Sequence, residues 1–152
     1  MKYIAYGSNM SIEQMKRRCP DARLLGTGRI NGAQLEFYLH ATVEESRVQG
    51  AYVPVAVWDI SDADEKRLDR YEGYPSYYIK KEWPVDMDDG STLTGMIYLM
   101  AYKRNAPPEA GYYRGIREAY EELGLNSEIK TVLAPARRRS IRISVKAAQA
   151  EE

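Results

Sequence analysis

The chain has 152 residues, with 22 lysines and arginines, 22 aspartates and glutamates, and no net charge at neutral pH. This length predicts one domain with a single substantial core, and the balanced charge excludes a global field that would attract nucleic acid or anionic lipid. The lone cysteine, Cys19, excludes an internal disulfide framework and is typical of a reducing compartment.

The first predicted strand covers residues 3–6 and breaks into Tyr6-Gly7-Ser8-Asn9. A strand that ends in this way can turn its backbone N–H groups outward, and glycine permits close approach of another group. These residues therefore suit a cradle for an anion or a carbonyl group, although a plain turn needs the same residues. Ser11 and Gln14 have capping-box spacing and predict a short helix that ends at Cys19-Pro20.

The next segments predict antiparallel strands. Residues 22–39 alternate like two strands joined near Asn31-Gly32, which is a strong hairpin signal. A polar loop is expected at residues 41–50. A buried strand follows over Gly50–Ile60, in which Pro54 implies an edge position or a bulge.

A second helix is predicted from the acidic N-cap sequence Ser61–Asp64 to about Tyr71, with Gly73 at the C′ position. Two further strands are expected at residues 77–85 and 92–102, and an Asp-Asp-Gly turn joins them.

The C-terminal part begins with a loop at Ala106-Pro107-Pro108 and an amphipathic helix over residues 111–123 that Gly124 ends. The alternating sequence Ser140–Val145 suggests a terminal strand, with Arg137–Arg139 as a solvated cluster beside it.

Six or seven strands with three short helices predict an α+β fold, in which a mostly antiparallel sheet is curled or barrel-like.

Composition also limits the chemistry. His40 is the only histidine, so a Ser–His–acid triad would depend on it, and its neighbours favour a solvated histidine at a strand end. One histidine and one cysteine cannot form a zinc site without carboxylates, and the acidic run at residues 86–90 lacks the register of an EF-hand loop. We therefore expect no metal site.

The chain has 13 tyrosines but one phenylalanine. Because a buried tyrosine hydroxyl needs a hydrogen-bond partner, this bias suits a polar-lined cavity, and half-buried strands equally.

No run of 18 apolar residues occurs, and the first residues lack the regions of a signal peptide. We therefore expect a cytoplasmic protein, a monomer or a homodimer, with no membrane or nucleic-acid partner.

Glu72 is the main candidate for proton transfer. It lies at the predicted C-terminus of the second helix, where the macrodipole offers a carboxylate no stabilisation. Aromatic residues in the stretch Tyr71–Tyr78 would also desolvate it, and both effects raise the pKa of a carboxyl group. From this stretch alone, a solvated glutamate at a helix end is the alternative.

Three stretches together resemble the γ-glutamyl cyclotransferase family, the AIG2-like superfamily. They are Tyr3–Asn9, Leu68–Tyr78 with its Glu-Gly pair, and Tyr98–Ile116, after which Glu122–Leu125 also match. The resemblance implies one domain over residues 1–152, with a core at about 3–125 and a C-terminal tail, 126–152, that has no counterpart.

The resemblance also implies a small closed sheet flanked by helices and a cofactor-free reaction. In that reaction a γ-glutamyl amide or γ-glutamyl amino acid cyclises to 5-oxoproline and releases an amine or an amino acid. In the family, the residue at the position of Glu72 accepts the proton, so we expect Glu72 to be the catalytic base and acid. The residues expected to bind the substrate are Tyr3, Ile4, Ala5, Tyr6, Gly7, Ser8, Asn9, Tyr78 and Tyr112.

This chemistry suits the residues that the chain offers. The α-amine of the substrate attacks its own γ-carbonyl, so the protein needs only to hold the folded conformer, move protons and bind the developing oxyanion. Three alternatives stay open: a non-catalytic module that binds a small acidic metabolite, an acyl transferase with Ser8 as nucleophile, and an interaction protein that acts through its tail. The leaving group is also open, from amino acids and ε-lysine to amines or a natural product.

Overall fold

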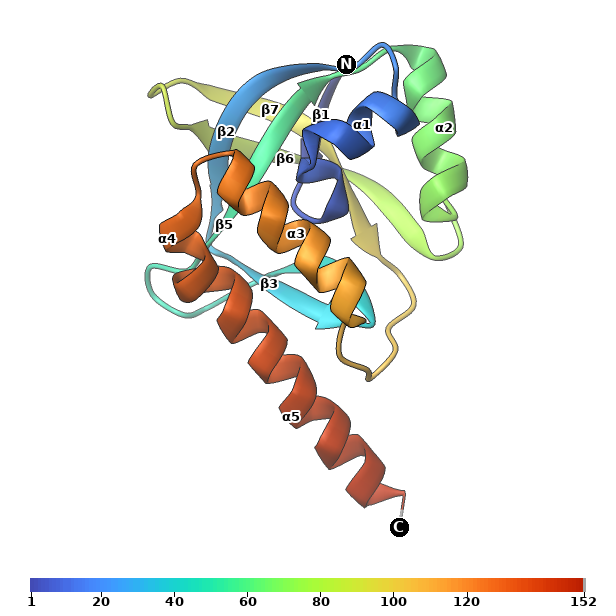
Figure 1. The fold of residues 1–152 in the computed structure, drawn as a ribbon, viewed down its shortest axis with the longest axis vertical. Coiled ribbons are helices and arrows are strands. Elements are labelled where there is room, and N and C mark those ends of the chain that lie inside the picture. Colours follow the sequence, from blue (N-terminus) through green and yellow to red (C-terminus); the bar gives the residue numbers. More distant parts are fainter. Residues whose placement is uncertain (152) are drawn as a thin grey trace.

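The computed structural model describes residues 1–151. Five strands form a closed barrel in the order β1-β5-β2-β6-β7, and β3 and β4 form a separate two-stranded sheet (Figure 1). The strands are β1 (Lys2–Ala5), β2 (Arg23–Asn31), β3 (Ala33–Tyr38), β4 (His40–Glu45), β5 (Tyr52–Asp59), β6 (Tyr78–Met87) and β7 (Thr92–Met100). The helices are η1 (Ser8–Met10), α1 (Ile12–Arg18), α2 (Asp62–Glu72), α3 (Ala110–Glu122), α4 (Asn126–Glu128), η2 (Ile129–Leu133) and α5 (Ala134–Ala150).

The barrel is mixed. The strand β1 pairs antiparallel with β5 and parallel with β7, and this parallel pair closes the barrel. The pairs β2–β5, β2–β6 and β6–β7 are antiparallel. The predicted α+β fold with a small, mostly antiparallel barrel is therefore confirmed.

The strand β5 is apolar along most of its length because both of its faces are covered. Val53, Val55 and Val57 on one face and Ala56 and Trp58 on the other are buried, as expected for a strand without a solvated face. Pro54 pairs with β2 but lies beyond the last β5 residue that β1 contacts. It therefore occupies an edge position, where the missing N–H costs no ladder hydrogen bond.

The predicted helix signals are confirmed at the ends that position the pocket. The side chain of Ser11 accepts a hydrogen bond from the Gln14 amide at the start of α1. Ser61 and Asp64 form a capping box at the start of α2, and Gly73 ends that helix in the left-handed conformation, with φ of 66°. Lys80 of β6 forms ion pairs with two carboxylates of α2 and so attaches the helix to the barrel.

Two predictions for the middle of the chain are wrong. The chain does turn at Gly32, but β2 and β3 form no hairpin, because both edges of β2 already pair with β5 and β6. Instead β3 pairs with β4, in which residues 41–45 had been expected to belong to a polar loop. The hydroxyl of Thr42 accepts a hydrogen bond from the Met100 amide (3.0 Å), which joins this small sheet to the end of β7.

The expected terminal strand is also wrong, since Ser140–Val145 lie within the helix α5. Ala136 and Ser140 are its buried residues, and their spacing of four places them on one helical face. Arg137 and Arg138 are exposed, as predicted, but Arg139 is only partly exposed. It donates a hydrogen bond to the Leu35 carbonyl (2.8 Å) and pairs with Glu36 (3.3 Å). The helix starts against β3 and then projects away from the barrel (Figure 1).

No helix within residues 1–151 is both long and apolar enough to cross a membrane.

Candidate active site

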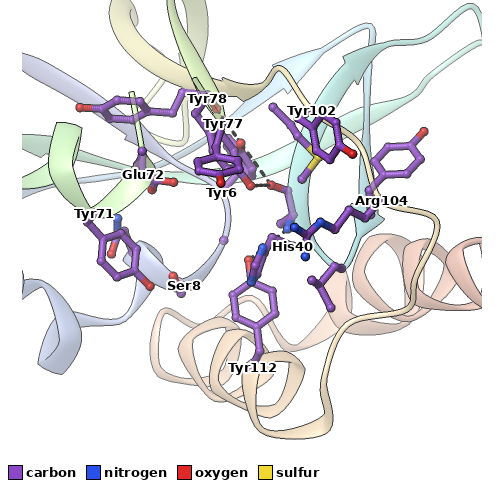
Figure 2. A pocket seen from close by; sticks show the side chains of 18 of the residues that line it. Tyr6, Ser8, His40, Tyr71, Glu72, Tyr77, Tyr78, Tyr102, Arg104 and Tyr112 are labelled. Atoms are coloured by element: carbon purple, nitrogen blue, oxygen red, sulfur yellow. Dashed lines mark hydrogen bonds between the residues drawn. The ribbon is translucent and has the colours of Figure 1, made fainter. Parts of the chain in front are cut away.

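A pocket of about 520 Å³ lies where the N-terminal turn, the end of α2 and the loop after β7 meet (Figure 2). Nine of the 13 tyrosines line it, which accounts for much of the aromatic bias of the chain. Tyrosine combines a rigid apolar ring with a hydroxyl that donates and accepts. The pocket therefore has largely apolar walls that also offer hydrogen bonds.

One wall is the turn at Gly7–Asn9, where the chain leaves the barrel after β1 and enters η1. The indole of Trp58 donates to the Asn9 carbonyl (3.0 Å), and the Asn9 amide group donates to the Tyr3 hydroxyl (2.9 Å). The backbone amides of Gly7, Ser8 and Asn9 donate no hydrogen bond within residues 1–151, as is usual for the first amides of a helix. The turn thus holds three free donors in a fixed position.

Arg18, the last residue of α1, joins this turn to the end of α2. Its guanidinium donates to the side chains of Asn9 (2.6 Å) and Ser8 (3.2 Å). It also donates to the Tyr71 hydroxyl and lies over the Tyr71 ring, 3.4 Å from the centroid. Sequence reasoning missed this residue, because a basic residue in the last turn of a helix is ordinarily read as solvated.

Glu72, at the C-terminus of α2, points into the pocket (Figure 2). Its side chain makes no hydrogen bond and no ion pair among the described residues, so its oxygens are free to take a proton from a ligand. Burial raises the pKa of Glu72 from the usual 4.5 to about 7, and the Arg18 charge acts in the opposite direction. A carboxyl group with this pKa exchanges protons readily near neutral pH.

Three tyrosine hydroxyls meet at the backbone of Ala41, the second residue of β4. Tyr78 donates to the Ala41 carbonyl (2.8 Å), and Tyr6 donates to the Tyr98 carbonyl (2.6 Å) with a longer contact to Ala41. Tyr112 instead accepts the Ala41 N–H (3.1 Å). Because its oxygen is the acceptor there, the hydroxyl hydrogen of Tyr112 is free to be donated into the pocket.

The hydroxyls of these tyrosines stay protonated across the physiological range. Burial raises the pKa of Tyr6, Tyr78 and Tyr112 above the usual value of 10. Tyr112 is therefore a neutral hydrogen-bond donor, suited to stabilising an oxygen that gains negative charge.

The structure brings most of the predicted site residues together in this pocket. Glu72 and eight of the nine predicted binding residues line it, namely Tyr3, Ile4, Tyr6, Gly7, Ser8, Asn9, Tyr78 and Tyr112. Ala5 does not line it, because it is buried within the sheet opposite Ala56. The roles of these residues in binding and catalysis stay predictions.

The opposite wall was not foreseen. It comes from the loop after β7 and the start of β4, and includes Tyr102, Arg104 and His40. His40 is exposed at the start of a strand, as expected, but its ring also lies 5.4 Å from the Tyr112 ring. No local pattern in the sequence indicates that these residues face the turn at Gly7–Asn9.

The alternative in which Ser8 acts as a nucleophile finds no support in the geometry. The hydrogen bond that the Ser8 hydroxyl makes is to Arg18 rather than to His40, so no base is in place to activate it as a nucleophile. Cys19 is buried, and burial raises the pKa of its thiol to about 12, which makes it unreactive. The part of the chain that the structure covers has no group of three or more metal-binding side chains.

The closed barrel thus carries a pocket in which one carboxylate and a turn with free backbone amides are lining groups. The family described as "Gamma-glutamyl cyclotransferase, AIG2-like" matches residues 3–115. The gamma-glutamylcyclotransferase of Homo sapiens is 31% identical over 144 residues, covering 86% of this chain and 76% of the relative. That of Mus musculus is 28% identical over 142 residues, with the same two coverages.

A solved structure named "Gamma-glutamyl cyclotransferase" superposes with a TM-score of 0.78 and 29% sequence identity, over 88% of this chain and 85% of that one. The family match covers more than half of the chain. The chain belongs to the AIG2-like γ-glutamyl cyclotransferase family, and it is an enzyme.

Proposed function

We propose that this enzyme converts a γ-glutamyl amide or γ-glutamyl amino acid to 5-oxoproline and releases the amine or amino acid, with Glu72 as general base and then general acid. The observation that carries the proposal is that Glu72 is the one carboxylate among the described lining residues. Its pKa of about 7 fits it for both proton transfers. The names of its relatives support the same reaction.

Substrate binding is assigned to the turn at Gly7–Asn9. Its free amides suit the α-carboxylate of the γ-glutamyl group, and Arg18 keeps the turn in place from behind. With the carboxylate held there, the α-ammonium lies toward Glu72. This arrangement folds the γ-glutamyl chain so that its own nitrogen approaches its γ-carbonyl.

The reaction then needs proton transfers only and no external reagent. Glu72 takes a proton from the α-ammonium, and the freed amine forms a bond to the γ-carbon. The carbonyl oxygen gains negative charge, which the Tyr112 hydroxyl stabilises. When the carbonyl re-forms, the bond to the leaving nitrogen breaks, and Glu72 gives its proton to that nitrogen. The ring nitrogen then loses its second proton to the Glu72 carboxylate, which passes it to the released amine.

Binding of the folded conformer, proton transfer and stabilisation of the oxyanion each contribute a rate factor of known size. A well-oriented intramolecular nucleophile can have an effective molarity of about 10⁵ M or more, and the enzyme contributes by holding the substrate in the folded conformer that permits this attack. A positioned acid–base group typically adds about 10²–10⁴-fold. A donor to the oxyanion adds about 10²–10³-fold.

The test is release of 5-oxoproline from γ-glutamyl-alanine by Glu72→Gln, with Glu118→Gln as the matched control. Glu118 is an exposed glutamate of α3 that does not line the pocket. We expect Glu72→Gln to bind the substrate in calorimetry and to lose turnover by about 10²-fold or more, whereas Glu118→Gln behaves as wild type. Turnover by Glu72→Gln at the wild-type rate would contradict the assignment.

The remaining expectations belong to the same proposal. The proposed binding partner of the pocket is the small γ-glutamyl substrate. The proposed location is the cytoplasm, and a single buried thiol is compatible with this reducing compartment. Fractionation of cells and solution scattering of the purified chain would test the cytoplasmic location and whether it is a monomer or a homodimer.

A further inference from the structure

One side of α2 carries three carboxylates, and the proposed reaction uses only the last of them. Glu65, Asp69 and Glu72 follow one another at spacings of four and three residues, which places them along one side of the helix. Leu68 lies on the same side and is fully buried, so this side faces the barrel. Within residues 1–151 the first two carboxylates form ion pairs, whereas Glu72 forms none.

Lys80 of β6 binds both of the paired carboxylates. Its ammonium lies 2.9 Å from the carboxylate of Glu65 and 2.7 Å from that of Asp69. Asp69 has a further partner, because the Tyr98 hydroxyl donates a hydrogen bond of 2.6 Å to it. No tyrosine hydroxyl in residues 1–151 donates to Glu65, whose side-chain partner is Lys80. Asp69 is therefore the carboxylate that joins the helix to a residue of the pocket.

Tyr98 of β7 is a fixed part of the pocket wall. It is buried and lines the pocket. Its ring packs edge-on against the ring of Tyr3, with 5.9 Å between the centroids, and its carbonyl accepts a hydrogen bond from the Tyr6 hydroxyl (2.6 Å). Through Asp69, the helix is thus attached to this wall one turn before Glu72.

The Tyr98 hydroxyl lies near Glu72 but is bound to Asp69. Side chains three positions apart on a helix have about 5–6 Å between their Cβ atoms, so a hydroxyl held by Asp69 is close to Glu72. Burial and the hydrogen bond to Asp69 raise the pKa of Tyr98, and the charge of Glu72 raises it further. Because a hydroxyl has one hydrogen, its donation to Asp69 leaves none for Glu72.

We infer that Asp69 is a positioning residue for Glu72. It attaches the last turn of α2 to Lys80 and Tyr98, and it holds the Tyr98 hydroxyl so that Glu72 has no donor among the described residues. A donor would stabilise the charged form of Glu72 and make it a weaker proton acceptor. This inference rests on the proposed cyclisation, since it concerns how the base of that reaction is held.

Other titratable groups also surround Glu72. The side chains whose pKa values respond to its charge are Arg18 of α1, Tyr3 of β1, Tyr6, Tyr78 of β6, Tyr98 of β7 and Tyr112 of α3. Of these, Tyr98 is the one that is hydrogen-bonded to Asp69 within residues 1–151. A substitution of Asp69 therefore acts directly on one member of this set.

The test compares Asp69→Ala with Glu65→Ala, which removes the other carboxylate bound to Lys80. Release of 5-oxoproline from γ-glutamyl-alanine gives kcat and KM for each variant. Because a small displacement of a reacting group can cost about 10²-fold, we expect Asp69→Ala to lower kcat by about 10- to 100-fold. Its KM should stay near that of wild type, since Asp69 does not contact the turn at Gly7–Asn9. Glu65→Ala should keep the kcat of wild type.

A second readout follows the carboxyl group of Glu72 directly. The NMR resonance of its carboxyl carbon, assigned by its loss in Glu72→Gln, should titrate at about 7 in wild type. Asp69→Ala frees the Tyr98 hydroxyl and removes a nearby negative charge, so the midpoint should fall by about 0.5 to 1 pH unit, the effect of one hydrogen bond. The rise of kcat/KM with pH should move in the same direction. In Asp69→Ala/Tyr98→Phe the midpoint should return part of the way, because no hydroxyl is left to donate.

Two milder variants serve if Asp69→Ala does not fold. Asp69→Asn keeps an acceptor for the Tyr98 hydroxyl and should retain part of the kcat, whereas Glu65→Gln, its matched control, should retain all of it. Equal kcat values for these two variants would refute the positioning role. Tyr98→Phe keeps the pair of Asp69 with Lys80 and should keep the midpoint of Glu72. A midpoint that rises in Tyr98→Phe would mean that the hydroxyl already binds Glu72, and would overturn the inference.

The positioning role and the proposed function can fail separately. If Asp69→Ala and Glu65→Ala have the same kcat and the midpoint of Glu72 moves in neither, the role of Asp69 is refuted while the cyclisation stands. If wild type releases no 5-oxoproline, the proposed function fails, and the catalytic consequence of the inference fails with it. A midpoint that falls in Asp69→Ala and not in Glu65→Ala would then still support the hold of Asp69 on the Tyr98 hydroxyl.

Discussion

Replacing Glu72 with glutamine should stabilise the folded protein, and by an amount that depends on pH. The pocket raises the pKa of Glu72 because burial disfavours the charged carboxylate. Between the unfolded pKa and the folded pKa, the folded chain therefore holds more protons than the unfolded chain. As pH rises through this window, the free energy of unfolding falls. Glutamine has nearly the same shape and no charge, so the free energy of unfolding of the variant does not fall in this way as pH rises.

The magnitude follows from the two pKa values. The change from 4.5 in the unfolded chain to about 7 in the folded chain corresponds to about 3 kcal/mol when each pKa unit is worth about 1.36 kcal/mol. Water in the pocket partly solvates the carboxylate, so about 2–3 kcal/mol is expected. Below about pH 4.5 both side chains are neutral, and the difference between variant and wild type should approach zero.

The assay is urea unfolding of wild type and Glu72→Gln at several pH values from 4.5 to 8.5. Other titrating groups are common to both proteins, so the difference between the two free energies of unfolding isolates Glu72. We expect it to grow from near zero to the full value as pH passes 7. Glu118→Gln, the exposed control, should show a difference near zero throughout. A difference for Glu72→Gln that is constant with pH, or a loss of stability at pH 8, would refute a desolvated carboxylate in the pocket.

Three further outcomes are expected. Because Glu72 must be ionised to accept a proton, kcat/KM of wild type should rise with pH through about 7 and then level off, in a pH–rate profile. Since the charge of Arg18 lowers the pKa of Glu72, Arg18→Gln should move the rise in kcat/KM to higher pH and weaken substrate binding. The exposed Arg17→Gln should leave both unchanged. A pH–rate profile that does not move in Arg18→Gln would contradict the effect of Arg18 on Glu72. Gly73→Ala places a side chain in the left-handed region, 2.6 Å from the Tyr77 ring, and should cost about 1–2 kcal/mol. The Tm of Gly73→Ala in thermal unfolding should be lower than that of wild type by about 2–8 °C. A variant as stable as wild type would contradict the predicted strain.

The site owes its geometry to contacts between elements that are far apart in sequence. The carboxylate of Glu72 lies at the end of α2, and the free amides follow β1. Arg18 joins the two by binding Ser8, Asn9 and Tyr71 at once. A change in this one side chain therefore acts on both the surroundings of Glu72 and the turn at Gly7–Asn9.

The opposite side of the pocket has a comparable construction. The tail of the chain supports the small sheet, where Arg139 of α5 binds the Leu35 carbonyl and pairs with Glu36. The same sheet contributes Ala41, to which Tyr78 and Tyr112 are hydrogen-bonded. The tail thus supports the sheet that orients two tyrosines of the pocket.

Local signals in the sequence were sufficient for several elements that matter to the site. Ser11 and Ser61 mark the starts of α1 and α2, and Gly73 marks the point where α2 ends beside Glu72. These features depend on residues within one helical turn, so the chain specifies them wherever it folds. The direction in which the pKa of Glu72 moves was also predicted, because its aromatic neighbours are adjacent in sequence.

Other features depend on which strands pair with one another. Short-range sequence patterns do not determine this pairing, because the partners are far apart in the chain. The turn at Gly32 suggested a hairpin, yet β2 has both edges occupied and β3 pairs with β4 instead. The alternation at Ser140–Val145 suggested a strand, but the buried face of Ala136 and Ser140 against β3 favours a helix.

By itself the sequence determined the family, the barrel class, the helix ends and the single carboxylate suited to proton transfer, because each of these resides in a local pattern or a set of residue types. The tertiary structure alone decided that Arg18 fastens the binding turn and that Arg104 faces Glu72 across the pocket. Such relations arise only when the closed barrel brings remote segments to one end, and packing of the whole chain, not the identity of neighbouring residues, sets them.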